Sequence, residues 1–136
     1  MLNNKKREGR NTSDSSHVFQ KIGLALGTPG SLNVIYEANN QKSCFSFSAG
    51  YTGIQLGIGL NAYCLESVEL NFLLNFSYLQ LNSTGNSNDN EKFLCIGPIA
   101  DFYLYGLHLQ LGLGQLYSSK SMILNLQLGY AYRFGN

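Results

Sequence analysis

Few side chains in this chain have the types and spacing needed for nucleophilic, acid–base or metal chemistry. The 136 residues include three cysteines and two histidines, Cys44, Cys64, Cys95, His17 and His108. Their spacing matches no Cys-x-x-Cys pair and no cysteine–histidine zinc pattern. No serine lies within two positions of His108 on the same strand face, so a nucleophile, base and orienting acid are not visible. We therefore predict no catalytic residues, no metal site and no cofactor.

The same residues have simpler interpretations. We expect the cysteines to be ordinary small side chains. A disulfide between Cys44 and Cys64 remains an alternative if their strands pair. His108 stands in an alternating run beside Gln110, on the polar side of that run. We expect it to be an interior histidine whose ring is satisfied by hydrogen bonds rather than a catalytic base.

Charged side chains within the alternating runs form a second candidate group, Lys21, Glu37, Asp101 and Arg133, with Glu69 near the start of a run. Charged residues make up only 12% of the chain, against about 25% in ordinary soluble domains. The formal net charge of +1 gives no electrostatic basis for nucleic-acid binding. The four residues within the runs comprise two positive and two negative side chains. A closed space requires such a balance, because an unpaired buried charge is costly. We predict a structural charge network, with a pore or proton path as the alternative.

Strands must position these side chains, because apolar residues after His17 recur with a period of two. Turn residues such as Thr28, Pro29 and Gly30 separate the runs. The pattern predicts eight strands, at residues 19–27, 32–38, 43–52, 54–63, 69–81, 93–104, 107–117 and 122–134.

The connections between these strands decide how they pair. Most are too short for a parallel crossover of about a dozen residues, so neighbouring strands must be antiparallel. Residues 18–136 are therefore predicted to form an all-β, eight-stranded antiparallel up-and-down β-barrel, preceded by a disordered polar tail at residues 1–17. Pro98 has no amide hydrogen to donate, so we expect a bulge or other irregularity there.

The two strand faces differ in composition. One face is rich in leucine, while the other carries Gly, Asn, Gln and Ser together with Lys21, Glu37, Asp101 and Arg133. A small barrel has an interior just wide enough for side chains, so small residues suit its concave side. A lysine or arginine facing lipid costs about 2–4 kcal/mol at the membrane midplane. We predict that the polar face lines the lumen and the apolar face meets lipid, as in a transmembrane barrel. Aromatic residues near strand ends fit interfacial girdles: Tyr36, Tyr51, Tyr78, Tyr130, Tyr132 and Phe134.

The last predicted strand resembles the C-terminal assembly signal of bacterial outer-membrane barrels. Gln127, Gly129, Tyr132 and Phe134 occupy the defining polar, glycine and aromatic positions. The predicted architecture is similar to that of the small OmpA/OmpX-type barrels. The resemblance implies the bacterial outer membrane as the location, with both termini on the periplasmic side.

The resemblance also implies partners and a role. The partners would be outer-membrane lipid and, through the C-terminal strand, the barrel-assembly machinery. The protein would be a monomer with a structural, adhesive or envelope-maintaining role. Residues 1–17 lack the apolar core of a secretory signal, so we expect either an upstream signal or no export.

Two alternatives from other classes remain open. A soluble lipocalin-like barrel would place the leucine-rich face inward and bind a small apolar ligand. A lipid-A-modifying barrel enzyme would resemble known relatives that use a histidine with a serine and an acid. The absence of a serine partner for His108 favours a non-enzymatic barrel.

The charge network gives a first prediction. Lys21→Met or Arg133→Met should destabilise the folded barrel, because each change leaves an acid in the lumen without its base. The measurement is the heat-modifiable mobility of the protein on a gel, which reports the folded barrel. Unchanged mobility of both variants would contradict a structural role for these charges.

Overall fold

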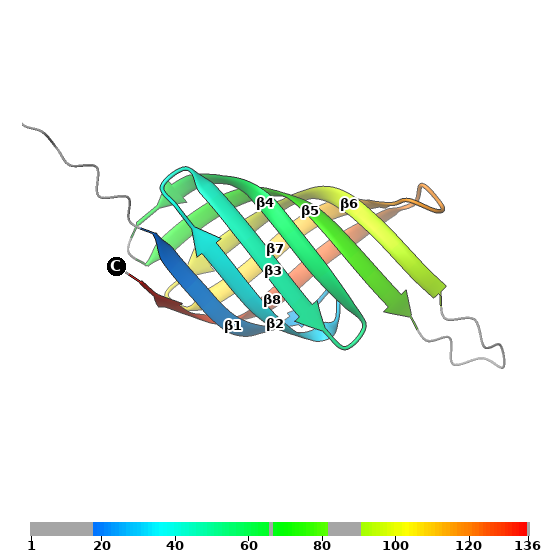
Figure 1. The fold of residues 1–136 in the computed structure, drawn as a ribbon, viewed down its shortest axis with the longest axis horizontal. Coiled ribbons are helices and arrows are strands. Elements are labelled where there is room, and N and C mark those ends of the chain that lie inside the picture. Colours follow the sequence, from blue (N-terminus) through cyan, green and yellow to red (C-terminus); the bar gives the residue numbers. More distant parts are fainter. Residues whose placement is uncertain (1–17, 66, 82–90, 136) are drawn as a thin grey trace, which may run out of the picture.

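The computed structural model describes residues 18–65, 67–81 and 91–135. These residues form a closed barrel in which each strand pairs antiparallel with the next and β1 pairs with β8, so the predicted eight-stranded antiparallel barrel is confirmed (Figure 1). The strands are β1 (Phe19–Gly27), β2 (Ser31–Asn39), β3 (Ser43–Gly50), β4 (Gly53–Cys64), β5 (Val68–Leu81), β6 (Glu91–Leu104), β7 (Leu107–Leu116) and β8 (Met122–Phe134).

Two sequence predictions fall outside this part of the chain. The predicted tail at residues 1–17 is one, and residues 82–90 of the predicted long loop are the other. The described residues include no helix long and apolar enough to cross a membrane.

β2, β4, β5 and β6 extend beyond the predicted runs by one or two residues, whereas β3 and β7 end earlier than predicted, at Gly50 and Leu116. β6 begins at Glu91 rather than at residue 93, because Glu91 and Lys92 continue the pairing with Leu81 and Gln80. Backbone hydrogen bonds need no apolar side chain, so strand pairing can extend beyond the alternating residues that predict the strand.

Pro98 interrupts one ladder without a bulge. It pairs in register with Leu74 on the β5 side. On the β7 side the pairs stop after Ile96 and resume at Ile99 with the register unchanged. The missing amide hydrogen therefore leaves a gap rather than an extra residue. The described register shift lies elsewhere, between Asn61 and Tyr63 of β4.

The polar face points into the barrel. Lys21, Glu37, Gln55, Asp101 and Gln127 are each at most 1% exposed, although all are polar or charged. The leucine-rich face points outward, with at least 40% of each of these side chains exposed: Leu24, Leu56, Leu74, Leu111 and Leu126. The lipocalin-like alternative requires the opposite arrangement and is therefore wrong.

The seam between β1 and β8 is lined on its inner side by very small residues. Gly23 pairs with Ala131, and Ala25 pairs with Gly129. A Cβ atom added to Gly129 would meet the carbonyl oxygen of Leu24 and the Cα and Cβ atoms of Ala25. Glycine at position 129 therefore allows the two end strands to approach closely enough to close the barrel.

The seam gives a second prediction. Gly129→Val should destabilise the barrel by about 1–3 kcal/mol, the usual cost of overpacking. The measurement is urea unfolding followed by far-UV circular dichroism after refolding into detergent micelles, where no assembly machinery is present. The neighbouring outward-facing Leu128→Val is the control, and its midpoint should change less. Equal midpoints for the two variants would show that position 129 does not limit closure.

Candidate functional site

Six charged or ionisable side chains meet inside the barrel, near the start of β1 and the end of β8. This end of the barrel is named the terminal end (Figure 1). They come from β1, β2, β5, β6, β7 and β8. Five of them are at most 1% exposed, and Arg133 has 22% of its side chain exposed. This group is named the charge cluster: Lys21, Glu37, Glu69, Asp101, His108 and Arg133.

Lys21 stands between two carboxylates. Its Nζ atom lies 2.5 Å from Oε2 of Glu37 and 2.7 Å from Oε2 of Glu69. The same ammonium group lies 4.8 Å from the centroid of the Tyr103 ring, within the range of a cation–π contact. Because Lys21 is 1% exposed, these partners replace the water that its charge has lost.

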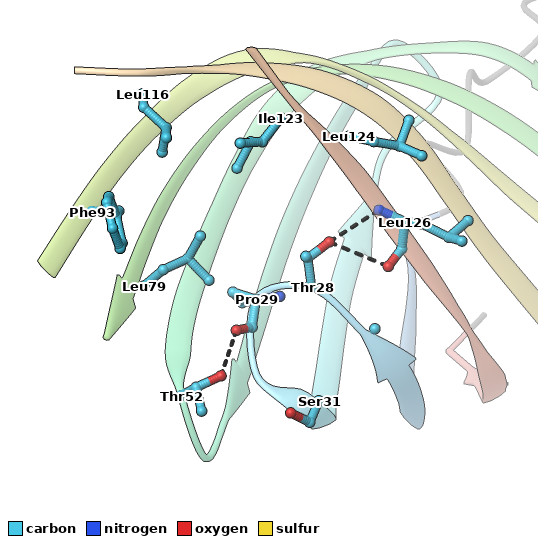
Figure 2. Close-up of a pocket in the computed structure, with 11 residues that line it drawn as sticks. Thr28, Pro29, Ser31, Thr52, Leu79, Phe93, Leu116, Ile123, Leu124 and Leu126 are labelled. Atoms are coloured by element: carbon cyan, nitrogen blue, oxygen red, sulfur yellow. Dashed lines mark hydrogen bonds between the residues drawn. The ribbon is translucent and has the colours of Figure 1, made fainter. Parts of the chain in front are cut away.

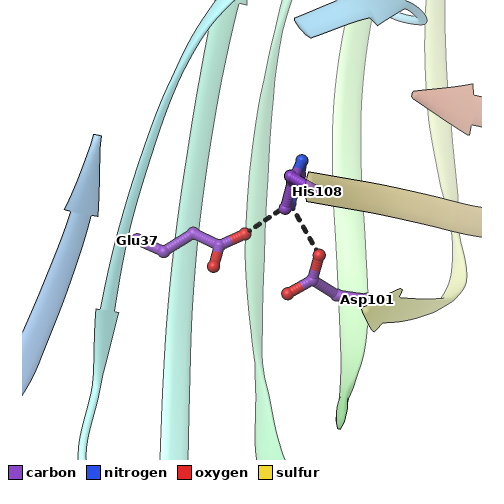
Figure 3. Close-up of side chains that lie close together, drawn as sticks. All are labelled: Glu37, Asp101 and His108. Atoms are coloured by element: carbon purple, nitrogen blue, oxygen red, sulfur yellow. Dashed lines mark hydrogen bonds and ion pairs between the residues drawn. The ribbon is translucent and has the colours of Figure 1, made fainter. Parts of the chain in front are cut away.

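His108 joins Glu37 to the third acid, Asp101 (Figure 3). Its Nε2 atom lies 2.8 Å from Oε1 of Glu37 and 2.6 Å from Oδ1 of Asp101. Nε2 therefore carries a hydrogen, since both neighbours are carboxylate oxygens. Asn71 donates a hydrogen bond of 3.1 Å to Oδ2 of Asp101. If His108 is doubly protonated, the charge cluster contains three positive and three negative groups, which gives a neutral interior.

Glu37, Asp101 and His108 are also residue types that bind metals, and their candidate ligand atoms lie within 4.8 Å of one another. Zinc bonds of about 2.0–2.2 Å in a tetrahedral site would separate ligand atoms by about 3.3 Å. The observed 2.6 and 2.8 Å separations are those of hydrogen bonds. Lys21 also occupies the remaining side of Glu37. The arrangement is therefore that of paired ions rather than a coordination sphere.

Arg133 covers the charge cluster at the terminal end. Its Nη1 atom lies 3.2 Å from Oε1 of Glu69 and donates to the backbone carbonyl of Leu65 over 3.0 Å. The guanidinium carbon lies 3.6 Å from the centroid of the Phe19 ring. Glu69 also accepts a hydrogen bond of 2.7 Å from Asn39. Glu69 therefore links Arg133 to Lys21, and through Lys21 to the rest of the cluster.

The structure places all four charged residues predicted from the sequence in this cluster. Lys21 and Arg133 are register partners on β1 and β8. The acid beside Arg133 is Glu69, which lies outside the predicted group of four. The sequence alone places Glu69 near the start of a run and His108 on a polar face, without indicating that they meet in one cluster. Glu69 lies on the same strand face as Asn71, and His108 on the same face as Gln110. This inward-facing position is the sequence signal that could have identified both as members of the cluster.

A layer of neutral amide and hydroxyl side chains fills the lumen beyond the charge cluster. Gln55 donates to Oε1 of Gln110 across the lumen over 2.9 Å, and Asn125 donates to Oε1 of Gln55 over 3.3 Å. Gln127 donates to Oγ of Ser48 over 2.9 Å. These residues are at most 4% exposed. The lumen is thus occupied by side chains that bind one another across it.

The predicted assembly signal divides between the two faces of β8. Gln127 is buried in the lumen and Gly129 lies at the seam. Tyr132 and Phe134 point outward near the terminal end, with 66% and 39% of their surface exposed.

The cysteines are free, and Cys44 pairs in register with Gly59 rather than with Cys64. The Cys44–Cys64 disulfide is therefore absent. Cys44 and Cys95 are buried and Cys64 is exposed.

Comparisons with known proteins give one structural neighbour to report. No protein-family model matches the sequence, and no curated protein matches it. Among solved structures, the chain is similar to the Yersinia pestis outer membrane protein Ail, whose backbone structure is in a phospholipid bilayer nanodisc. The alignment has 15% identity, covers 88% of this chain and 99% of that chain, and has a TM-score of 0.42.

The cluster geometry gives a third prediction, which ranks its two bases. Lys21→Met should cost about 3–5 kcal/mol of unfolding free energy, because it leaves Glu37 and Glu69 buried beside an apolar group. Arg133→Met should cost less than about 1 kcal/mol, because Arg133 is partly exposed and Glu69 keeps Lys21 and Asn39 as partners. Urea unfolding of both variants in the same detergent measures the difference. A larger loss for Arg133→Met would contradict the ranking.

Proposed function

We propose that this chain is a monomeric transmembrane β-barrel of the bacterial outer membrane, with a structural, adhesive or envelope-maintaining role. The observation that carries the proposal is the outward apolar belt, formed by exposed aliphatic and aromatic side chains on all eight strands. Monomeric soluble proteins rarely expose contiguous apolar patches larger than a few hundred Å². A belt around a closed barrel has no second layer to pack against, and lipid hydrocarbon is the environment that suits it.

The positions of the outward charges support this proposal. Among the described side chains, the exposed lysines lie at the ends of the barrel, Lys42 and Lys120 in turns and Lys92 at the start of β6. The middle of the outward face is aliphatic, with Ile58 paired to Leu74. Charges are absent from the described part of the barrel surface where the hydrocarbon core would lie.

Exposed aromatic rings gather at both ends of this belt. Tyr51 and Tyr117 lie in turns at the end opposite the termini, with 88% and 82% exposed. Tyr105 and Tyr132 lie near the terminal end, with 76% and 66% exposed. Tyrosine places an apolar ring in the membrane boundary and a hydroxyl in water. Tyrosines at both ends of the barrel therefore suit the two membrane–water interfaces.

The closed sheet supports a monomer, since pairing of β1 with β8 leaves no unpaired edge along most of the barrel. The proposed partners are outer-membrane lipid and the assembly machinery, which would read the strand that ends with Tyr132 and Phe134. A non-enzymatic role is favoured because His108 is 0% exposed and held between two carboxylates. It therefore has no access to a lipid substrate outside the barrel.

Membrane embedding gives a fourth prediction. Leu74→Lys, in the middle of the belt, should destabilise the protein by about 2–4 kcal/mol in phospholipid vesicles. Met122→Lys, also outward-facing but at the rim, should cost no more than about 1 kcal/mol. Urea unfolding in vesicles measures both. A water-exposed surface would tolerate both lysines equally, so equal and small effects would contradict the proposal.

A further inference from the structure

The rim opposite the terminal end, here named the far rim, is uneven at the seam. The β1–β8 ladder ends where Gly27 pairs with Gln127, and Thr28 makes the last backbone bond to Leu126. β8 continues along β7 as far as Met122. Residues 122–125 of β8 therefore have a strand partner on the β7 side only. At about 3.3 Å per residue, this free edge is about 13 Å long.

A cavity of about 580 Å³ opens beside the free edge (Figure 2). Its size falls within the usual range of ligand pockets, about 300–1,000 Å³. Four of its wall residues lie on the inward face of the strands, from β5, β6, β7 and β8: Leu79, Phe93, Leu116 and Ile123. Pro29, in the β1–β2 turn, also lines it.

The inward face changes character at this height. Asn125 and Gln127 are buried in the hydrogen-bonded amide layer, whereas Ile123, the next inward residue of β8, is apolar. The hydroxyls of Thr28 and Thr52 at the pocket wall are engaged with the protein itself. Thr52 donates to the carbonyl of Pro29, and the Thr28 hydroxyl bonds to Asn125 and to the backbone of Leu126. No charged side chain lines the pocket within the described residues. These walls suit a hydrocarbon occupant.

The pocket continues onto the outer surface of the barrel. The same cavity is lined by Ile123, which points inward, and by Leu124 and Leu126, which point outward and are 62% and 45% exposed. The space therefore passes around the free edge of β8 and joins the apolar belt. A hydrocarbon chain in the surrounding bilayer can enter this space sideways, without crossing water.

We propose that this rim pocket binds an acyl chain of a membrane phospholipid, which enters laterally past the free edge of β8. The inference rests on the proposed membrane location, because the continuity of pocket and belt matters only if lipid covers the belt. The occupant is a lipid of the bilayer rather than a free fatty acid, since the open side of the pocket adjoins the belt and none of the described wall residues carries a charge that would hold a carboxylate.

The test uses tryptophan reporters, because the chain has no tryptophan of its own. The full chain is refolded into vesicles of phosphatidylcholine whose acyl chains are brominated, and into unbrominated vesicles. Phe93→Trp reports from the pocket. Phe76→Trp reports from the outward belt, where 43% of the side chain is exposed, and Phe19→Trp reports from the buried terminal end. Heat-modifiable mobility checks that each variant is folded.

The proposal expects Phe93→Trp to lose as large a fraction of its fluorescence to bromine as Phe76→Trp, while Phe19→Trp loses little. Quenching of Phe76→Trp without quenching of Phe93→Trp would overturn the pocket proposal and leave the membrane location intact. Absence of quenching at both positions would overturn the membrane location, and the pocket proposal with it.

A second pair of variants separates an acyl chain inside the pocket from lipid outside the wall. Ile123→Asn, added to Phe93→Trp, places an amide in the pocket and should relieve most of the quenching. Met122→Asn, at the neighbouring outward position, is the matched control and should leave it unchanged. Quenching that Ile123→Asn does not relieve comes through the wall and overturns the proposal. Quenching seen only when brominated fatty acid is added to unbrominated vesicles would also overturn it, in favour of a free ligand.

Discussion

Closure of the sheet by β1 and β8 is the constraint on which the other features of this molecule depend. It removes the sheet edges over most of the barrel height and divides every strand into an inner and an outer face. It requires very small residues where the end strands meet, at Gly23, Ala25, Gly129 and Ala131. It also leaves a lumen with space for side chains and little else. Every inward polar group must then find its partners within that lumen.

The contents of the lumen follow from this requirement in three layers. At the terminal end, the acids of the charge cluster are matched by Lys21, His108 and Arg133. In the middle, neutral amides such as Gln55 and Gln110 bind one another across the barrel. Near the far rim, inward residues become apolar where the seam no longer closes the wall. A buried ion network adds little net stability because desolvation opposes the pairing, but removal of one member leaves an uncompensated charge. The charge cluster therefore favours the strand register that brings its members together over registers that would separate them.

Much of the fold could be predicted from the sequence, because the strand period of two places residues on a face without any knowledge of their contacts. The inward phase of Lys21 and Asp101 and the pairing of Lys21 with Arg133 both follow from that period and from closure. The contacts across the lumen could not be predicted, since they depend on how far the strands are staggered around the barrel. Glu69 is distant from Arg133 in sequence, and only the stagger brings it there. The rim pocket was likewise hidden, because Phe93 and Ile123 continue an ordinary strand pattern and only the unequal strand lengths expose them to the same space.

The proposed membrane location requires that lipid, rather than water, covers the outer face of the barrel. The most direct test is sedimentation analysis of the refolded full chain in buffer without detergent, combined with far-UV circular dichroism, against the same protein with phospholipid vesicles. If lipid covers this face, the folded chain aggregates without detergent and, with vesicles, floats with them and resists extraction by alkaline carbonate. A folded, monodisperse monomer that stays in the aqueous phase without detergent would contradict it.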